Sequence, residues 1–336
     1  MLNLNISSLP MQQVLHDLAV GLNTEVTQIC NCYTVRLPER VGSGFVQGVQ
    51  FPFGFALLNY QCLFYQDTVI RFDLDQVHPM KFLHCFDGHF THCFAQSNNT
   101  HEVDRFQNIG VASKRTQGHV LHFPAKVNTG ICSVEMDRAK FQQKTACLAN
   151  MESSALTEAL VDAQAHRQFY RKGNYSVQVS EIIQLIKAVE FRDLASGLYL
   201  EGKSYEILSL YWQQFSDLLA TKLDYPNISK IEYDHLREIT TFIAENIRTG
   251  PTLGKVEQAL RLKEKYVQKL FKKALNTTFA QYLKEYRLKK SAELLQTSDL
   301  NVSQIVYALG LSNRSYFTKI FKEKFGITPT DYKAEP

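Results

Sequence analysis

Short apolar and aromatic runs, separated by turns that often contain glycine, make up most of residues 1–150. Typical runs are GSGFVQGVQF, FALLNYQCLFY, TVIRFDL, MKFLHCFDGHFTHCF and GHVLHFP. Alternating or aromatic-rich runs of this length are typical of β-strands. Between two of them, Asp87-Gly88 predicts a two-residue β-hairpin turn. We therefore expect residues 1–150 to form a β-rich domain, either a small barrel or a jelly-roll-like fold.

The apolar pattern changes to the helical period in residues 151–230. One stripe recurs every three or four positions and predicts an amphipathic helix. The stripe consists of Ile207, Leu208, Tyr211, Phe215, Leu218 and Leu219. It can pack inside the chain or pair two chains, so this helical region is expected to couple the flanking domains and is a candidate for homodimerisation. The segment LDYPNISK, residues 223–230, predicts a short break.

Residues 231–336 are expected to form an all-helical domain with an internal repeat. Residues 259–282, ALRLKEKYVQKLFKKALNTTFAQY, align with residues 308–332, ALGLSNRSYFTKIFKEKFGITPTDY. Each copy predicts a short helix, a tight turn and a second helix, the anatomy of a helix-turn-helix. The two predicted modules are residues 252–275 and residues 301–325. A linker helix over residues 279–297 would be about 28 Å long, close to the roughly 34 Å between successive major grooves on one face of DNA.

Local signals in the second module agree with this interpretation. Asn301 followed by Gln304 predicts a capping pair at the start of its first helix. Gly310 supplies the left-handed residue that the turn requires. The patterns together predict an α+β multidomain chain with a β-rich amino-terminal domain, a helical middle region and an all-α domain that contains two helix-turn-helix modules.

The composition indicates the cellular compartment in which we expect the protein. The chain has 336 residues, of which 45% are hydrophobic and 21% charged, enough apolar material for sizeable cores. No apolar run approaches the roughly 20 residues that a membrane span needs. The amino terminus lacks a basic segment followed by an apolar one, so we expect no secretory signal. Seven cysteines at irregular spacing, without a C-x-x-C pair, do not indicate a disulfide framework. We therefore expect a cytoplasmic protein without membrane association.

Charge is distributed unevenly along the chain. Residues 251–336 contain 16 Lys and Arg against 8 Asp and Glu, a net charge of +8, whereas residues 1–250 have a net charge of −4. Such a basic segment indicates a polyanionic partner. Lys and Arg pair with phosphates and guanine edges, while Asn and Gln can read adenine. The candidate DNA-binding residues are the polar ones on the second helix of each module: Glu264, Lys265, Gln268, Lys269, Lys272, Asn313, Arg314, Ser315, Thr318, Lys319 and Lys322.

The segment YLKEYRLKKSAELLQTSDLNVSQIVYALGLSNRSYFTKIFKEKFGITPTDYK carries a family resemblance. It ends in an F-G-x-x-P-x-x-Y motif formed by Phe325, Gly326, Pro329 and Tyr332. With this motif, residues 235–333 resemble the DNA-binding domain of the AraC/XylS family of bacterial transcription regulators. The first module departs from the family pattern, with Arg261 at the usual turn glycine and Lys263 at the usual capping serine. The resemblance implies a transcriptional regulator, with an activator as the expectation, and a ligand-sensing amino-terminal domain. Its expected partners are promoter or operator DNA, RNA polymerase and a small-molecule effector.

A second resemblance covers other parts of the chain. The segments GSGFVQGVQFPFGFALLNYQC, GLYLEGKSYEILSL and NRSYF are similar to the branch of that family that contains the pyochelin-type siderophore regulators. This branch implies an iron-siderophore as effector and control of iron-siderophore uptake genes.

The segment HPMKFLHCFDGHFTHCF raises the question of a metal or ligand site. If Asp87-Gly88 is a hairpin turn, alternate side chains share one sheet face, with Phe86 opposite His89. The His and Cys side chains then divide between two faces, which argues against a closed four-ligand metal site. The candidate ligand-binding residues on the shared face are Phe82, His84, Phe86 and His89.

The alternatives are a cupin-like enzyme or a metal-binding protein with an appended helix-turn-helix domain. The chain contains no His-x-His, no G-x-S-x-G and no phosphate-binding glycine loop. We therefore expect no catalytic residues, no resident metal and no cofactor.

Overall fold

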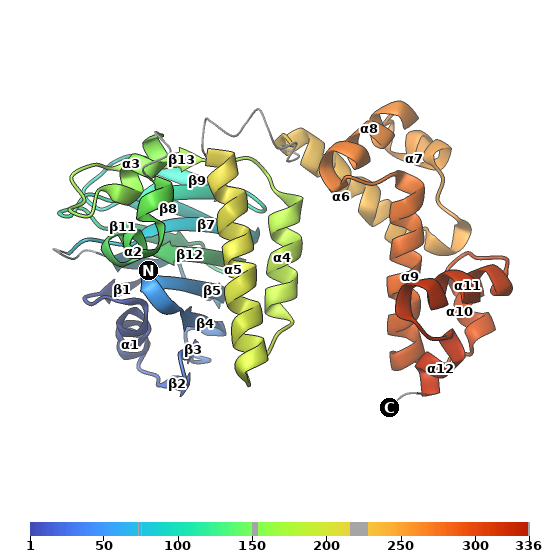
Figure 1. The fold of residues 1–336 in the computed structure, drawn as a ribbon, viewed down its shortest axis with the longest axis horizontal. Coiled ribbons are helices and arrows are strands. Elements are labelled where there is room, and N and C mark those ends of the chain that lie inside the picture. Colours follow the sequence, from blue (N-terminus) through green and yellow to red (C-terminus); the bar gives the residue numbers. More distant parts are fainter. Residues whose placement is uncertain (73, 75, 150–153, 216–227, 335–336) are drawn as a thin grey trace. The chain divides into compact units, whose positions relative to one another are not determined.

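The computed structural model describes residues 1–336 except residues 73, 75, 150–153, 216–227 and 335–336. The chain divides into two compact units, Met1–Tyr225 and Pro226–Pro336 (Figure 1). The first unit is rich in strands and the second is helical, as the sequence predicts. No helix among the described residues is long and apolar enough to cross a membrane.

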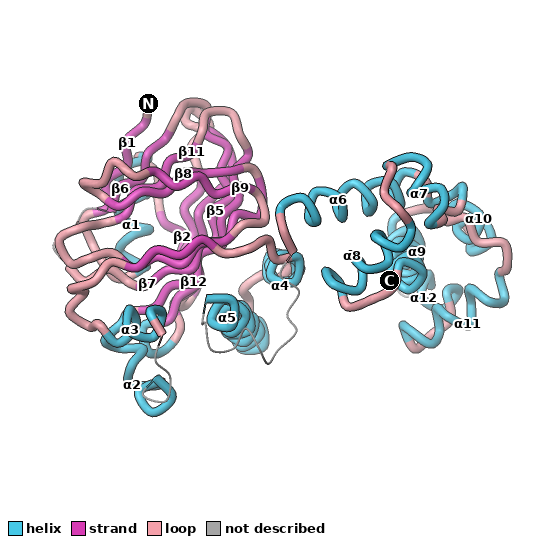
Figure 2. The backbone as a smooth tube through the Cα atoms, turned by 90° about the horizontal axis from the view of Figure 1, so that it is seen from above, coloured by secondary structure: helices cyan, strands magenta, loops and turns pink. Residues whose placement is uncertain are grey.

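The strands of the first unit form two sheets, which Figure 2 shows as two layers. The five-stranded sheet has the order β1 (Leu2–Ile6), β6 (Thr68–Phe72), β11 (His119–Phe123), β8 (His89–Phe94) and β9 (Thr100–Asp104). The eight-stranded sheet has the order β13 (Phe169–Lys172), β10 (Asn108–Ala112), β7 (Met80–Asp87), β12 (Asn128–Met136), β5 (Phe55–Phe64), β4 (Gly42–Gln50), β3 (Cys32–Arg36) and β2 (Val26–Ile29). The β1–β6 pair is parallel and the other pairs are antiparallel.

The main core of the first unit combines side chains of both sheets with those of helix α1 (Met11–Leu22). Leu58 and Tyr60 of β5 and Phe90 of β8 are among its fully buried members. Both sheets are open, so in the described residues the predicted β-rich domain is confirmed and a closed barrel is wrong.

The predicted hairpin at Asp87-Gly88 is also wrong. Strand β7 pairs with β10 and β12, whereas β8 pairs with β9 and β11, so the chain passes from one sheet to the other at this point. A type I′ hairpin requires a positive φ at both central residues, but only Gly88 has one, at 60°. The predicted cross-strand pairing of Phe86 with His89 is therefore absent.

The outer face of the eight-stranded sheet is covered by helices. Helices α4 (Val177–Lys187) and α5 (Leu194–Phe215) lie side by side there (Figure 1), and α2 (Arg138–Ala149) and α3 (Ala155–Val161) contact each other. Phe82 of β7 stacks on Tyr211 and Phe215 of α5, with ring centroids 5.3 and 5.7 Å apart. The described part of the predicted stripe is therefore buried inside the chain and is not free to pair two chains.

The helical region predicted for residues 151–230 thus packs as part of the first unit up to Phe215. Two further predictions fall on residues that the structure does not describe. Leu218 and Leu219 of the stripe lie outside the described residues, as do residues 223–227 of the predicted break.

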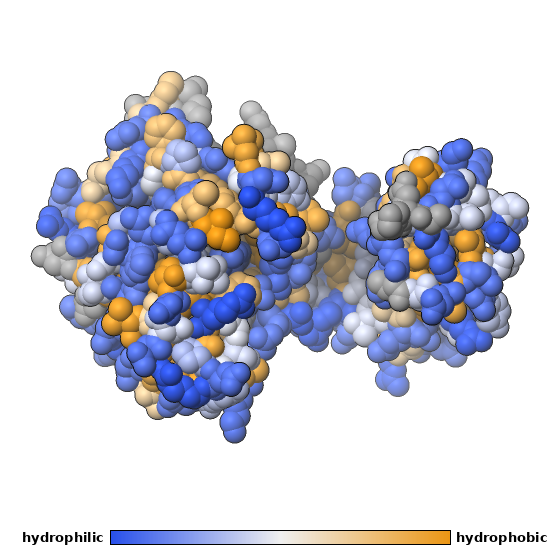
Figure 3. Space-filling model, turned by 90° about the horizontal axis from the view of Figure 1, so that it is seen from below, coloured by the Kyte–Doolittle hydropathy of each residue, from blue (hydrophilic) through white to orange (hydrophobic). Residues whose placement is uncertain are grey.

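The second unit consists of helices. In chain order they are α6 (Lys230–Glu245), the 3-10 turn η2 (Ile247–Thr249), α7 (Leu253–Leu260), α8 (Glu264–Leu275), α9 (Phe279–Thr297), α10 (Val302–Ala308), α11 (Arg314–Phe325) and α12 (Pro329–Ala334). Polar side chains cap most of these helices: Ser229 forms a capping box with Glu232, and Asn301 forms the predicted one with Gln304. On the face drawn in Figure 3, hydrophilic side chains cover most of the surface, with apolar ones in small groups.

Candidate nucleic-acid interface

Two helix pairs of the second unit have the same local geometry. In each pair a short helix, α7 or α10, is followed by a turn and by a helix of 12 residues, α8 or α11. Each turn contains one left-handed residue, Arg261 with φ of 58° and Gly310 with φ of 66°. The sequence repeat therefore corresponds to a repeated backbone conformation.

Gly310 is required at its position for two reasons. An L side chain in the left-handed region costs roughly 1–2 kcal/mol. In addition, a Cβ atom on Gly310 would lie 2.4 Å from the carbonyl oxygen of Ile247 and 2.7 Å from that of Arg248. The turn before α11 is thus packed against the backbone of η2, and Arg287 of α9 donates a hydrogen bond to the Gly310 carbonyl oxygen at 3.3 Å.

Arg261 occupies the corresponding position of the first turn. It has the same left-handed conformation but carries a side chain, and Lys263, which precedes α8, makes no side-chain capping hydrogen bond. The departures from the family pattern that the sequence indicated therefore leave the helix pair intact. Their cost is backbone strain at Arg261. At the start of α8 the Glu264 backbone N–H donates to Glu257 Oε2 of α7 at 3.2 Å, which replaces a cap from Lys263.

Helix α8 separates its apolar and polar side chains cleanly. Val267, Leu270, Phe271 and Ala274 are buried. The five predicted DNA-binding side chains of α8 are all exposed: Glu264, Lys265, Gln268, Lys269 and Lys272. The neighbouring Lys273 forms an ion pair with Glu232 of α6 at 2.7 Å. Within the described residues the three predicted lysines have no carboxylate partner, so their charges remain available to an external anion.

Helix α11 shows the same separation into a buried apolar face and an exposed polar face. Phe317, Ile320 and Phe321 are buried, while the predicted Ser315, Lys319 and Lys322 are exposed and Thr318 is half-buried. Lys324 forms an ion pair with Glu285 of α9. In the part of the chain that the structure describes, Lys319 and Lys322 have no such partner. Both helices therefore pair one lysine internally and leave others unpaired on the exposed face.

The two remaining predicted residues, Asn313 and Arg314, make contacts within the unit. The Asn313 side-chain oxygen caps α11 by accepting a hydrogen bond from the Tyr316 backbone N–H at 2.9 Å. Arg314 Nη1 donates to Ser303 Oγ of α10 at 3.2 Å, beside a recess of about 540 Å³ that Lys333 also lines. Sequence reasoning missed Ser303, because nothing in the spacing of these residues indicates the contact.

Helix α9 contacts both helix pairs. The rings of Phe279 and Tyr282, near its start, pack against Phe271 of α8 with centroids 5.5 and 5.2 Å apart. Leu288 and Leu295, further along α9, belong to the core that α10 and α11 form. The apolar positions of α9 therefore shift from one side of the helix to the other along its length.

The predicted ligand-binding residues of the first unit do not surround one cavity. Phe82 and Phe86 are buried in the core between the eight-stranded sheet and the outer helices. His84 Nε2 lies 3.0 Å from Ser180 Oγ of α4, and burial lowers the pKa of His84 to about 3, so this imidazole is neutral. His89 lies on β8, in the other sheet. Across the described residues, no three His, Cys, Asp or Glu side chains are arranged to hold a metal ion.

Comparison with known proteins bears on the second unit. Residues 257–335 match the family described as helix-turn-helix domain. The Msm operon regulatory protein of Streptococcus mutans is 25% identical over 156 residues, which are 45% of this chain and 54% of that protein. The transcriptional activator RhrA of Rhizobium meliloti is 31% identical over 139 residues, 40% of this chain and 44% of that protein.

A solved structure of an AraC-type transcriptional regulator from Chromobacterium violaceum is 26% identical; the match covers 31% of this chain and 92% of that chain, with a TM-score of 0.30. The chain spans about half the length of the curated relatives it matches. The carboxy-terminal part of the chain therefore carries a helix-turn-helix domain, and its curated relatives include transcriptional regulators.

Proposed function

We propose that this chain is a sequence-specific transcriptional regulator that binds double-stranded DNA through both helix pairs and responds to a small molecule through its first unit. The observation that carries the proposal is the repeated charge arrangement on α8 and α11. Among the described residues, each helix exposes unpaired lysines on one face and pairs one further lysine, Lys273 or Lys324, with a carboxylate of the same unit. Duplex DNA is the polyanion whose major groove admits such a helix.

The connection between the pairs supports the use of both. Helix α9 has 19 residues and is therefore about 28 Å long. Its two ends pack on different helix pairs. A rigid connection of this length suits two recognition helices that enter successive major grooves, which are roughly 34 Å apart on one face of the duplex.

The exposed residues of each face divide into two kinds of contact. Gln268 of α8 and Ser315 of α11 lie in the first half of their helices, where recognition helices of this type contact base edges. Lys272 and Lys322 lie further along and are suited to phosphates, which provide affinity without sequence preference. Arg314 lies at the first position of α11, where release of its bond to Ser303 would let it reach a guanine edge.

Other parts of the proposal rest on the sequence resemblance alone. An iron-siderophore effector, a role in iron-siderophore uptake and a contact with RNA polymerase stay predictions. No observation on the described residues favours the alternative of a cupin-like enzyme or a metal-binding protein, and the curated relatives named above are regulators.

Paired lysine substitutions test the DNA-binding surface. DNA selected from a random pool by the full chain is titrated at several salt concentrations by fluorescence anisotropy. We expect Lys322→Ala to weaken binding to all sequences and to reduce the salt slope by about one. Lys324→Ala on the same helix, whose charge is already paired with Glu285, is the matched control and should leave the slope unchanged. Equal effects of the two substitutions would contradict the assigned face.

A further inference from the structure

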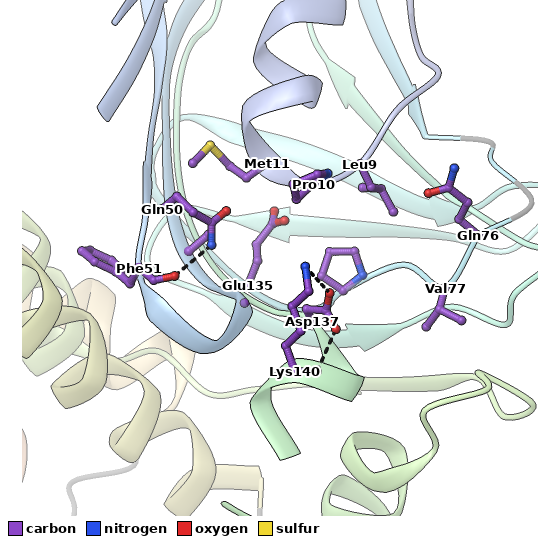
Figure 4. Close-up of a pocket in the computed structure, with 13 residues that line it drawn as sticks. Leu9, Pro10, Met11, Gln50, Phe51, Gln76, Val77, Glu135, Asp137 and Lys140 are labelled. Carbon is purple, nitrogen blue, oxygen red and sulfur yellow. Dashed lines mark hydrogen bonds and ion pairs between the residues drawn. The ribbon is translucent and has the colours of Figure 1, made fainter. Parts of the chain in front are cut away.

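The first unit contains a cavity of about 450 Å³ at one end of its sheets (Figure 4). Its walls come from the start of α1, the end of β4, the segment before β7 and the end of β12. This volume lies within the roughly 300–1,000 Å³ typical of small-molecule sites. The wall combines apolar side chains, including Leu9, Met11 and Val77, with a few polar ones.

One polar group of the wall is the carboxylate of Glu135 on β12, which is 4% exposed. Its Oε1 atom accepts hydrogen bonds from Lys81 Nζ at 2.7 Å and from Ser133 Oγ at 3.0 Å. Lys81 also lies over the ring of Phe72, 4.7 Å from its centroid. Among the described residues, the second oxygen, Oε2, has no hydrogen-bond donor. Oε2 is not one of the fully buried polar atoms that lack a partner, so a donor that enters the cavity can reach it.

A second acceptor comes from Gln50 at the end of β4. Gln50 Nε2 donates to the backbone carbonyl oxygens of Phe51 at 3.1 Å and of Phe55 at 2.8 Å. Only the NH₂ group of an amide can donate to two carbonyl oxygens, so these bonds fix the orientation of the side chain. In the described part of the chain, Oε1 receives no donor. Figure 4 shows the Gln50 amide and the Glu135 carboxylate directed toward the same part of the cavity.

The charges around the cavity are balanced. Glu135 is paired with Lys81, and Asp137 is 3.6 Å from Lys140 Nζ and also accepts the Lys140 backbone N–H at 3.0 Å. A charged ligand would therefore introduce an unpaired charge into a partly apolar site, which is costly. An anionic group at Gln50 and Glu135 would also face acceptors instead of donors.

We propose that this cavity binds a small uncharged molecule with two neighbouring O–H or N–H donors, which bind Gln50 Oε1 and Glu135 Oε2. The apolar part of the ligand packs against Leu9, Met11 and Val77. The inference rests on the proposed ligand response of the first unit and names the class of molecule that it recognises. The site differs from the one predicted at Phe82, His84, Phe86 and His89.

A matched series of cyclohexane derivatives tests the ligand class. Binding to the full chain is measured by saturation-transfer NMR for cis-1,2-cyclohexanediol, cyclohexanecarboxylate and cyclohexylammonium, which share a ring and differ in charge and donors. We expect the diol to bind and the two ions to bind at least about tenfold more weakly. The carboxylate loses a hydrogen bond to a charged group, and the ammonium brings an unpaired charge into a partly apolar site. Equal or tighter binding of either ion, or no binding of the diol, would overturn the proposal.

Variants locate the binding without disturbing the buried ion pair. Val77 makes no side-chain hydrogen bond, and Val77→Phe fills the cavity; Val20→Phe, on α1 at a position that is 80% exposed, is the control. The diol should bind at least about tenfold more weakly to Val77→Phe, as expected for overpacking, and normally to Val20→Phe. Unchanged binding to Val77→Phe, with an unaltered circular dichroism spectrum, would refute this site.

DNA binding of the same preparations separates the two proposals. Loss of diol binding in a chain that still binds selected DNA refutes only the ligand assignment. Failure of the wild-type chain to select any DNA sequence, while the diol binds, refutes the proposed regulator and leaves the cavity assignment in place.

Discussion

The turn before α11 offers a test of how the second unit is held together. Gly310 and Gly326 both have a positive φ, 66° and 82°. A Cβ atom on Gly326 would meet nothing within 4 Å, whereas one on Gly310 would lie 2.4 Å from the Ile247 carbonyl oxygen. Gly326→Ala therefore introduces backbone strain alone, worth about 1–2 kcal/mol. Gly310→Ala adds a steric conflict with backbone atoms, typically about 1–3 kcal/mol.

We expect Gly310→Ala to lower the free energy of unfolding of the second unit by about 3 kcal/mol and Gly326→Ala by about half as much. With a urea dependence of about 1–3 kcal/mol per molar, the Gly310→Ala midpoint should fall by roughly 1–3 M. Urea unfolding of the full chain is followed by circular dichroism, which reports both units. The single tryptophan, Trp212, lies on α5 and reports the first unit.

The tryptophan transition serves as an internal control, because both glycines belong to the second unit and Trp212 belongs to the first. Equal midpoint shifts for Gly310→Ala and Gly326→Ala would show that the contact with η2 does not stabilise the turn. A shift of the tryptophan transition would show that the two units do not unfold independently.

Three further predictions concern strain, charge and pH. Arg261→Gly should raise the thermal midpoint of the second unit by removing left-handed strain worth about 1 kcal/mol; an unchanged or lower midpoint in circular dichroism would contradict this. Lys272→Ala should reduce the salt slope of DNA binding by about one. Lys273→Ala should leave the slope unchanged, because the charge of Lys273 is already paired with Glu232; equal slopes of the two variants in anisotropy titrations would contradict this. Burial lowers the pKa of His84 and His92 from 6.5 to about 3, so below pH 6.5 the unfolded chain binds protons that the folded chain does not. The first unit should then lose up to about 1.4 kcal/mol per pH unit for each histidine, measured by tryptophan fluorescence in urea; constant stability from pH 6.5 to 4.5 would contradict it.

Local sequence signals predicted much of the second unit. The capping box of Asn301 and Gln304 and the left-handed Gly310 depend on neighbouring residues and are found as expected. The exposed faces of α8 and α11 follow from helical periodicity, which is also a local property. The contacts of single side chains were not predictable in this way: Arg314 bonds to Ser303 on another helix.

The first unit was harder to predict because its strands pair with strands that are distant in the sequence. Asp87-Gly88 resembles a hairpin turn, yet β7 is placed by β10 and β12, which come later in the sequence. The alternation along β7 was predicted correctly: Phe82 and Phe86 belong to one core, and Leu83 and Cys85 to the other. The cavity joins Gln50 to Glu135 across different strands, and neither residue lies in a recognisable motif.

Interference by diethyl pyrocarbonate, which modifies N7 of both adenine and guanine, tests the central claim most directly on DNA selected by the full chain, because modification at N7 blocks major-groove contacts. We predict two clusters of interference about one helical turn, roughly 10.5 base pairs, apart on one face of a site of about 17–20 base pairs. Gln268→Ala should remove the interference at one cluster, and Arg314→Ala should remove it at the other. Each substitution should weaken the free energy of DNA binding by about 1–3 kcal/mol where a bidentate base contact is lost. A single cluster that Gln268→Ala leaves unchanged would contradict the use of both helix pairs.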